Sequence, residues 1–595
     1  MGHEPVGNAN RLALKSWRRA LELKGLVETG PHQTLLSFIM ASSQFHAERP
    51  ALRDEARQLS YRDLTDLALF YAKWSLASGL GRGATVAVMM VNSAAYPAIW
   101  LGITHAGRLA ALINSNLRGA VLAHAIRVSG ARHVIVDAST QAALAEITQD
   151  VPWDVQIWVH DAATGGLQGI SVVAPGFADV TEPAAHPARQ DPALLIYTSG
   201  TTGMPKAAYV RHGRILEWSA WFAGMTDAQS TDRLFNCLPM YHSTGGVVAI
   251  GAMLAVGGSV VVRPRFSATR FWDDVVGNDC TIFQYIGELC RYLVRSPPHP
   301  LEAAHRLRLC CGNGLRGDIW EALQARFQIP RILEFYAATE GNVSLYNCEG
   351  KPGAIGRVPP FLAASYPIEL IQIDVETGSP IRGPDGFCLR CRQTEAGEDM
   401  SPIRNDSKAA ARQFDGYTDA GATDRKILHD VFERGDCWFR SGDLLRRDAA
   451  GFFYFVDRIG DTFRWKGENV STQEVAAVVS ACAGITDAVV YGVVVPGTEG
   501  RAGMAAITVN DDFSLTGLRR HLIAHLPDYA RPLFVRICMH METTSTFKLT
   551  KSRLVKEGLA PSDGNTVWFN DATRQSFVRL DPMLVEQIGA GDLKI

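Results

Sequence analysis

The chain has 595 residues, of which 47% are hydrophobic and 20% are charged, and its formal net charge at pH 7 is −2. This composition excludes an intrinsically disordered chain, and the small net charge gives no whole-chain reason to expect a nucleic-acid partner. A single hydrophobic core stops growing well before this length, so we expect at least two domains.

The first residues and the cysteines indicate the compartment. Residues 1–10 contain charge, Gly and Pro but no apolar run, which predicts that no signal peptide is present. The 11 cysteines are odd in number, and none precedes residue 237. We therefore expect free thiols in a reduced, cytoplasmic setting.

Two stretches without charged residues have to be weighed as membrane spans. The first, residues 83–107, is predicted to form a buried strand, Val86–Val91, followed by a helix that is capped near Ser93. The second, residues 245–262, is divided by two adjacent glycines into an apolar helix and a β-branched strand. We therefore expect globular core in both, and any membrane attachment should be peripheral, at the cytoplasmic face of the plasma membrane.

Apolar strand-like runs alternate with amphipathic helical patterns along most of the chain. The helix expected over Asp318–Phe327 has Ile319, Trp320 and Leu323 on one face, and Trp218 and Trp221 are interpreted as a buried helix face. The expected strands include His133–Val136, Ala193–Tyr197, Ser259–Val262 and Arg306–Cys311. This alternation predicts a doubly wound α/β architecture. Residues 395–426 are polar and are expected to form surface loops.

A domain boundary is expected near residues 457–461, because a new α+β pattern begins after it. Ser471 and Glu474 fit a capping box that opens a helix. Two strands are expected after this helix, Ala488–Val495 and Gly503–Val509. The predicted domains are a large one at residues 1–457 and a smaller, mobile α+β domain at residues 458–595, joined by a hinge at 457–461.

The strongest chemical signal follows the strand at 193–197 and ends at Lys206. Its glycines allow backbone N–H groups to turn inward around an anion, its hydroxyls can donate to phosphate oxygens, and Lys206 adds a positive charge. The residues of this loop are Tyr197, Thr198, Ser199, Gly200, Thr201, Thr202, Gly203 and Lys206. A flexible surface loop is the plain alternative, and the spacing differs from the P-loop of nucleotide hydrolases.

This loop resembles the phosphate loop of the adenylate-forming superfamily, which includes acyl-CoA synthetases, adenylation domains of peptide synthetases and luciferases. Residues 334–340, Glu-Phe-Tyr-Ala-Ala-Thr-Glu, are similar to the Tyr-Gly-x-Thr-Glu segment of that superfamily. The resemblance implies that Tyr336 stacks on adenine, Thr339 contacts phosphate and Glu340 binds Mg²⁺, with Thr198 as a second metal ligand. A single protein carboxylate suits Mg²⁺, which usually keeps water and phosphate oxygens as its other ligands.

Later segments match the same superfamily in order. The resemblance implies that Asp443 and Arg458 contact the ribose and that Lys548 stabilises the transition state of adenylation, as Lys206 does in the loop. The resemblance further implies that Lys548 serves only the first of two half-reactions, and that the hinge carries it away before a thiol attacks. Ala337 replaces a glycine found in many members, which leaves the class intact and the fine structure of the pocket open.

Within the superfamily, five strings resemble the fatty acid transport protein branch, at residues 266–272, 284–293, 311–316, 460–470 and 497–506. The resemblance implies ligation of a long- or very-long-chain fatty acid to coenzyme A with ATP and Mg²⁺. It further implies nucleotide contacts by Gly312 and Asn313, and contacts to the acyl group or coenzyme A by His242, Gly314, Trp465, Lys466 and Gly467.

Other interpretations remain open at this point. The chain can be a ligase that passes its acyl-adenylate to a carrier protein, or a ligase that acts on a bile acid. It can also be a non-catalytic lipid-import or lipid-binding protein. Residues 312–317 also match the G-x-G-x-x-G of dinucleotide-binding folds, and Cys388 and Cys391 form an isolated C-x-x-C. Lys206, Glu340, Asp443 and Lys548 together favour an enzyme. The acyl chain length and the oligomeric state are not given by these patterns.

Overall fold

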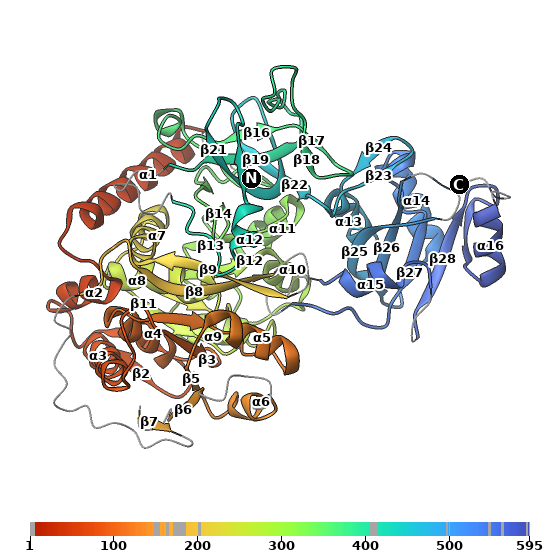
Figure 1. The fold of residues 1–595 in the computed structure, drawn as a ribbon. Helices are drawn as coiled ribbons and strands as arrows, with labels where there is room; N and C mark the ends of the chain where they lie inside the picture. Colours follow the sequence, from red (N-terminus) through yellow and green to blue (C-terminus); the bar gives the residue numbers. More distant parts are fainter. Residues whose placement is uncertain are drawn as a thin grey trace. The chain divides into compact units, whose positions relative to one another are not determined.

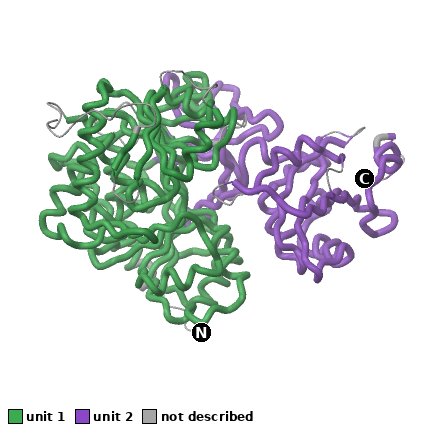
Figure 2. Tube along the Cα trace, turned by 90° about the horizontal axis from the view of Figure 1, so that it is seen from below, with its two compact units in different colours: residues 1–366, 402–428 green, residues 367–401, 429–595 purple. Residues whose placement is uncertain are grey.

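A computed structural model describes residues 6–147, 155–161, 166–169, 186–199, 204–404, 413–495, 498, 500–544, 549–560, 564–590 and 593. The chain forms two compact units, coloured separately in Figure 2. The first comprises residues 1–366 and 402–428, and the second comprises residues 367–401 and 429–595. Residues 367–401 and 429–457 therefore group with the C-terminal part of the chain, and the hinge at 457–461 stays a prediction.

The first unit contains a seven-stranded sheet in the order β7-β6-β5-β3-β4-β8-β9. Its inner strands are parallel, and the strands at both edges, β7 and β9, are antiparallel to their neighbours. The strands are β3 (Thr85–Met89), β4 (Leu109–Leu112), β5 (His133–Val136), β6 (Gln156–His160), β7 (Leu167–Gly169), β8 (Pro192–Ser199) and β9 (Pro205–Arg211).

An eight-stranded sheet in the same unit has the order β15-β14-β13-β12-β10-β11-β1-β2. It too is parallel inside and antiparallel at both edges. Its strands are β1 (Pro50–Arg53), β2 (Gln58–Ser60), β10 (Arg233–Asn236), β11 (Ser259–Val262), β12 (Ile282–Ile286), β13 (Leu309–Asn313), β14 (Ile332–Ala337) and β15 (Ser344–Asn347). Parallel sheets of this kind are buried on both faces, which explains their apolar, β-branched strands.

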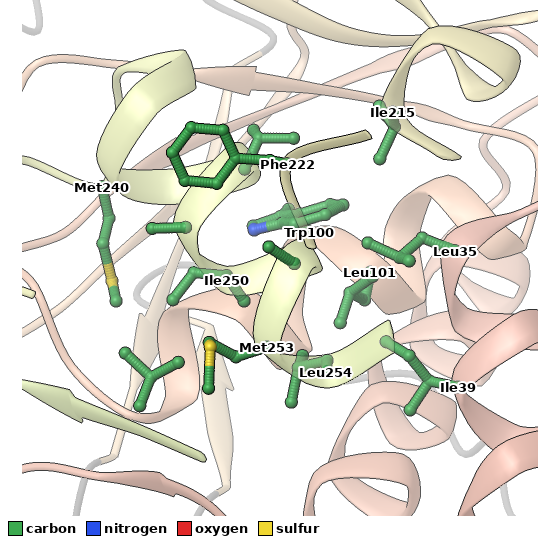
Figure 3. Close-up of a cluster of buried hydrophobic side chains, with 14 of the residues drawn as sticks. Leu35, Ile39, Trp100, Leu101, Ile215, Phe222, Met240, Ile250, Met253 and Leu254 are labelled. Atoms are coloured by element: carbon green, nitrogen blue, oxygen red, sulfur yellow. The ribbon is translucent and has the colours of Figure 1, made fainter. Parts of the chain in front are cut away.

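Helices join the two sheets through one continuous core that contains side chains of both. Leu254 of α8 lies on the side of that helix toward Leu101 of α4 and Ile39 of α2, and Ile250 and Met253 lie on its other side, toward Met240 (Figure 3). Each such side chain stabilises the fold by about 1.5–3 kcal/mol relative to exposure. The helices of this unit are α1 (Val6–Thr29), α2 (Leu35–Ser43), α3 (Tyr61–Ala77), α4 (Ala95–His105), α5 (Gly119–Ser129), α6 (Gln141–Ala145), α7 (His212–Met225), α8 (Ala249–Ala255), α9 (Phe271–Gly277), α10 (Gly287–Arg295), α11 (Gly317–Phe327) and α12 (Ala420–Asp424) (Figure 1).

The second unit has a smaller α+β body. Its main sheet, β25-β26-β27-β28-β29, packs with α13, α14 and α16 around a separate hydrophobic core. A second sheet, β16-β19-β21-β20 with β22 on β21, carries residues from the middle of the chain. The elements are β16 (Glu369–Ile371), β17 (Ile373–Asp374), β18 (Ser379–Pro380), β19 (Gly397–Pro402), β20 (Ile427–His429), β21 (Cys437–Arg447), β22 (Phe453–Arg458), β23 (Phe463–Trp465), β24 (Glu468–Val470), α13 (Thr472–Ser480), β25 (Ile485–Val493), β26 (Ala502–Val509), α14 (Leu515–His525), β27 (Phe534–Ile537), α15 (Ser552–Glu557), β28 (Thr566–Asp571), β29 (Ser576–Arg579) and α16 (Pro582–Ala590).

Most sequence predictions of elements are confirmed, with informative exceptions. Both uncharged stretches form a strand and a helix, and no helix among the described residues has the length and apolar character needed to cross a bilayer. Ser93 does not cap α4, because the N-cap residue is Ala94 and no side chain bonds there. Ser471 does cap α13, accepting from the N–H of Glu474. The expectation of surface loops over 395–426 was wrong at Gly397–Pro402, which is a buried strand.

Candidate active site

The predicted phosphate loop joins β8 to β9 at the edge of the seven-stranded sheet. Antiparallel pairing places Thr198 opposite Lys206, so the two ends of the loop are held side by side. Gly200, Thr201, Thr202 and Gly203 lie outside the described residues, as does the side chain of Ser199. The structure therefore confirms that the two strands flanking the loop pair as a hairpin. Phosphate binding by the loop itself stays a prediction.

Tyr197 has its side chain in the core. Its hydroxyl donates to the backbone oxygen of Ala125 at 2.7 Å, and burial raises the pKa of this phenol. Successive residues of a strand point to opposite faces, so Thr198 points away from that core. The predicted nucleotide contact of Tyr197 is thereby limited to its backbone.

The predicted adenine-binding residues lie at the carboxyl ends of neighbouring strands. Strand β13 ends at Asn313 and β14 ends at Ala337, and Gly312 pairs in register with Glu334. Gly312 has no room for a side chain, since an added Cβ would lie 2.1 Å from the backbone oxygen of Tyr285. Ligands of parallel α/β sheets bind at this edge.

A buried carboxyl group fixes the loop that follows β13. Glu334 accepts hydrogen bonds from the N–H of Leu315 at 3.0 Å and from the hydroxyl of Tyr285 at 2.6 Å. Gly314 turns this loop with a φ of 77°. Burial raises the pKa of Glu334 to about 8. The loop predicted to contact the nucleotide is thus tied to a carboxyl group that is largely neutral at pH 7.

This group makes stability depend on pH. Because the pKa of Glu334 rises from its ordinary value of 4.5 to about 8 on folding, the folded chain holds an extra proton between these values. The free energy of unfolding therefore falls as pH rises through this window, by up to about 1.4 kcal/mol per pH unit. A glutamine cannot ionise. Between pH 5.5 and 7.5, the free energy of unfolding of Glu334→Gln should therefore fall by about 2–3 kcal/mol less than that of wild type, as measured by urea denaturation. Equal losses would contradict this assignment.

The segment after β14 meets the segment after β10. Thr339 and Ser243 share a hydrogen bond between their hydroxyls at 3.0 Å. His242 is half-buried, with its ring 4.7 Å from that of Tyr241. Two of the predicted positions, Thr339 and His242, therefore belong to one neighbourhood, although they are far apart in sequence.

Glu340 and Thr198 lie near the same residue, one that the sequence analysis did not single out. Tyr417 donates from its hydroxyl to Oε1 of Glu340 at 2.6 Å, and the Thr198 side chain lies close to the same hydroxyl. Tyr417 is 8% exposed and Glu340 is 9% exposed. The carboxylate and hydroxyl oxygens gathered here are hard donors of the kind that Mg²⁺ prefers, so the residues fit this metal.

A buried ion cluster fixes the backbone around this link. Arg214, with a fully buried side chain, donates to the backbone oxygen of Thr339 at 3.1 Å. Asp415 pairs with Arg211 at 2.7 Å and with Arg214 at 3.9 Å. Because α7, the turn after β14 and residues 413–418 share these contacts, the position of Glu340 is set by three separate segments. Sequence reasoning missed Arg214, Asp415 and Tyr417. Asp415 and Tyr417 lie in the polar stretch at 395–426, and Arg214 lies on α7.

An aromatic cavity opens directly after Glu340. The centre of a water molecule can occupy about 60 Å³ of it. Its lining residues are Trp17, Glu217, Trp218, Trp221, Gly341, Asn342, Ser344, Tyr346, Val358, Leu362 and Tyr366. Trp17 comes from α1, and its ring packs edge-on against those of Trp221 and Tyr346, at 5.9 and 6.0 Å. Trp218 and Trp221, predicted only as a buried helix face, thus line a space next to the predicted metal ligand.

In the second unit, the two predicted ribose contacts lie together. Asp443 and Arg458 are register partners in β21 and β22, and the guanidinium Nε lies 3.6 Å from Oδ1 of Asp443. The next residue after Arg458 is also anchored, since the N–H of Ile459 donates to Gly442 at 2.9 Å. The Arg458 side chain is 56% exposed, and that of Asp443 is 18% exposed.

The predicted contacts to coenzyme A form a tight hairpin. Lys466 and Gly467 are the turn between β23 and β24, and both have positive φ, at 51° and 82°. Such a two-residue turn favours Gly at the second position. Trp465 is buried, and Lys466 pairs with Asp528 at 3.1 Å. Lys548 lies outside the described residues.

Comparison with known proteins assigns the family. The model of the AMP-binding enzyme family matches residues 40–385, and that of the AMP-binding enzyme C-terminal domain matches residues 474–548. The chain belongs to the AMP-binding enzyme family. It is 39% identical to long-chain fatty acid transport protein 1 of Mus musculus, over 98% of this chain and 90% of that protein. It is also 39% identical to medium/long-chain-fatty-acid–CoA ligase FadD6 of Mycobacterium tuberculosis, over 86% of this chain and 83% of that protein.

Solved structures share the fold. ATP-bound MatB from Rhodopseudomonas palustris matches with a TM-score of 0.71 at 20% identity, covering 88% of this chain and 98% of that one. The anthranilate CoA ligase AuaEII in complex with anthranoyl-AMP matches with a TM-score of 0.74 at 20% identity, covering 89% of this chain and 98% of that one. The predicted family is thus confirmed, as is the predicted fold class of a large α/β unit with a smaller α+β C-terminal part.

Proposed function

We propose that this chain is an ATP- and Mg²⁺-dependent fatty acid:CoA ligase for long or very long chains. It joins the acid to ATP as an acyl-adenylate, releases pyrophosphate, and then transfers the acyl group to coenzyme A with release of AMP. The observation that carries the proposal is the 39% identity to a fatty acid transport protein over 98% of the chain, together with the equal identity to a fatty-acid–CoA ligase.

In the first step, we assign nucleotide binding to the edges of the two sheets. Tyr336 and the loop at 312–314 hold adenine, while Thr198, Lys206 and Thr339 contact phosphate. Glu340 and Thr198 hold Mg²⁺, which when bound neutralises charge on the phosphates. The attacking carboxylate and the α-phosphate are both anionic, so Lys206 and fixed donors lower the barrier by offsetting their repulsion.

We assign the aromatic cavity to the acyl chain. Its walls begin at Gly341, beside the metal ligand, and continue along α7 and β15. Arg214, which donates to Thr339, precedes Trp221 by seven residues on α7, which spans about 10 Å along a helix axis. Trp17 packs on Trp221 at that far end. A chain entering beside Glu340 would therefore run toward Trp17, and each buried methylene contributes about 0.8 kcal/mol. His242 and Gly314 stay candidates for contacts near the carboxylate.

The second step uses the C-terminal part of the chain. We assign coenzyme A to Trp465, Lys466 and Gly467, and we assign rotation about residues 457–461 to the change between half-reactions. A polar anchor surrounds this hinge: Asp457 is fully buried and accepts from the hydroxyl of Thr472 at 3.1 Å, and Asp461 pairs with Lys551 at 2.9 Å. Hinges of this kind are short segments between rigid elements.

The ribose assignment gives a direct prediction. Asp443→Ala should raise the KM for ATP by roughly tenfold or more, because hydrogen bonds to a charged acceptor are each worth about 1.5–3 kcal/mol. Steady-state kinetics at saturating fatty acid and coenzyme A measure this change. A KM for ATP equal to that of wild type would place the ribose elsewhere.

The substrate class is tested by AMP release from the purified chain with fatty acids from C8 to C26 and with a bile acid. The proposal expects release that requires coenzyme A and is fastest with a long-chain acid. Fastest release with the bile acid would reassign the substrate, and transfer only to a carrier protein would reassign the acceptor. No release with any acid would favour a lipid-binding protein without catalysis. For the cell we propose a cytoplasmic enzyme, peripheral on the membrane where fatty acids arrive, whose charged product cannot readily recross the bilayer.

A further inference from the structure

Residues 413–418 form a strap along β9, the edge strand that follows the predicted phosphate loop. The N–H of Tyr209 donates to Gly416 at 3.0 Å, and the N–H of Thr418 donates to Ala207 at 2.9 Å, so the strap pairs with β9. Gly416 adopts a φ of 74°, a conformation that strains other residues. These backbone bonds fix the position of Tyr417.

The side chain of Tyr417 is fixed as firmly as its backbone. Its ring packs with Ala208 and Ala422 in a small buried cluster and lies edge-on to Phe414 at 6.3 Å. Its own N–H donates to the hydroxyl of Thr423 at 3.0 Å. The phenol is therefore presented at one place, and its hydroxyl does not depend on solvent for orientation.

This hydroxyl bonds one of the two oxygen donors assigned to Mg²⁺ and lies close to the other. It donates to Oε1 of Glu340 at 2.6 Å, with the Thr198 side chain nearby. A carboxylate rotates about its last side-chain torsion with little preference, so an unsupported Glu340 would have to be ordered when the metal binds. Carboxylates that ligate metals are usually held by such outer hydrogen bonds, whose loss costs about 10–100-fold in metal affinity or activity.

We propose that Tyr417 is a positioning residue for the metal site: it holds the Glu340 carboxylate in the orientation that accepts a divalent cation with the nucleotide, beside the Thr198 hydroxyl. The proposal rests on the proposed function, because it takes Glu340 and Thr198 as metal ligands. Tyr417 acts through Glu340 and does not itself contact the reacting atoms.

Tyr417→Phe tests the proposal, because it keeps the ring in its cluster and removes only the hydroxyl. Mn²⁺ binding to the full chain with a non-hydrolysable ATP analogue is measured from the loss of the free Mn²⁺ signal in electron paramagnetic resonance. We expect the Kd for Mn²⁺ to rise about 10–100-fold. Tyr61→Phe is the matched control, since Tyr61 is buried and donates to the backbone oxygen of Gly258 at 2.8 Å. It should leave the Kd unchanged.

A double substitution separates positioning from general damage. If Tyr417 acts through Glu340, Tyr417→Phe should change the Kd for Mn²⁺ by less than about twofold in a Glu340→Gln background. A Kd for Tyr417→Phe equal to that of wild type, or a full additional loss in the double variant, would overturn the proposal. If wild type itself performs no fatty-acid-dependent adenylation, the proposed function fails instead. The two failures are therefore distinguishable.

Discussion

Lys548→Ala should slow acyl-adenylate formation by about 10²–10³-fold, the usual effect of deleting one preorganised group that stabilises charge. With a synthetic fatty acyl-adenylate and coenzyme A, the same variant should form thioester at nearly the wild-type rate. The reason is that the hinge at 457–461 would have carried Lys548 away before the thiol attacks. Single-turnover kinetics of each half-reaction measure both rates.

The choice of control matters for this experiment. Lys551 pairs with Asp461 at 2.9 Å beside the hinge, so Lys551→Ala would disturb more than a surface charge. Lys556 is exposed on α15 and is the better control, and Lys556→Ala should leave both half-reactions unchanged. Full adenylation activity in Lys548→Ala would refute the assigned role. Equal loss in both half-reactions would indicate a role in folding or in docking of the C-terminal part.

Glu340→Gln should lower the rate of adenylation by roughly 10²-fold or more, because a metal ion that acts as a Lewis acid supplies several kcal/mol to the transition state. The amide oxygen of Gln can still accept from Tyr417, so thermal stability should change little. Pyrophosphate-exchange rates over a range of Mg²⁺ concentrations, with thermal melts beside them, check both statements. Wild-type activity at saturating Mg²⁺ would remove Glu340 from the metal site.

Local patterns were sufficient to predict many of the strands and helices. The run His133–Val136 forms β5 within the same bounds, and the glycine pair at 257–258 does separate α8 from β11. The pairing of Thr198 with Lys206 and of Asp443 with Arg458 was not predicted, although each pair lies within one antiparallel hairpin. These features depend on side chains close in sequence or on one hairpin.

The parts that could not be predicted depend on long-range packing. Tyr417 lies 77 residues after Glu340, in a stretch whose polarity indicated surface loops, and only the pairing of its strap with β9 brings it to the carboxylate. Trp17 lines the cavity because α1 packs against α7, and at this contact Gly224 leaves no room for a side chain beside Ala20. Periodicity predicts the buried face of such a helix without indicating which element covers it.

Exchange of labelled pyrophosphate into ATP without coenzyme A tests the central claim most directly. With the purified chain, Mg²⁺ and a long-chain fatty acid, the account predicts exchange that is absent when the acid is omitted. It also predicts an enzyme-bound acyl-adenylate that becomes acyl-CoA and AMP when coenzyme A is added. Exchange without any acid, or release of ADP and phosphate in place of AMP and pyrophosphate, would contradict activation through an acyl-adenylate.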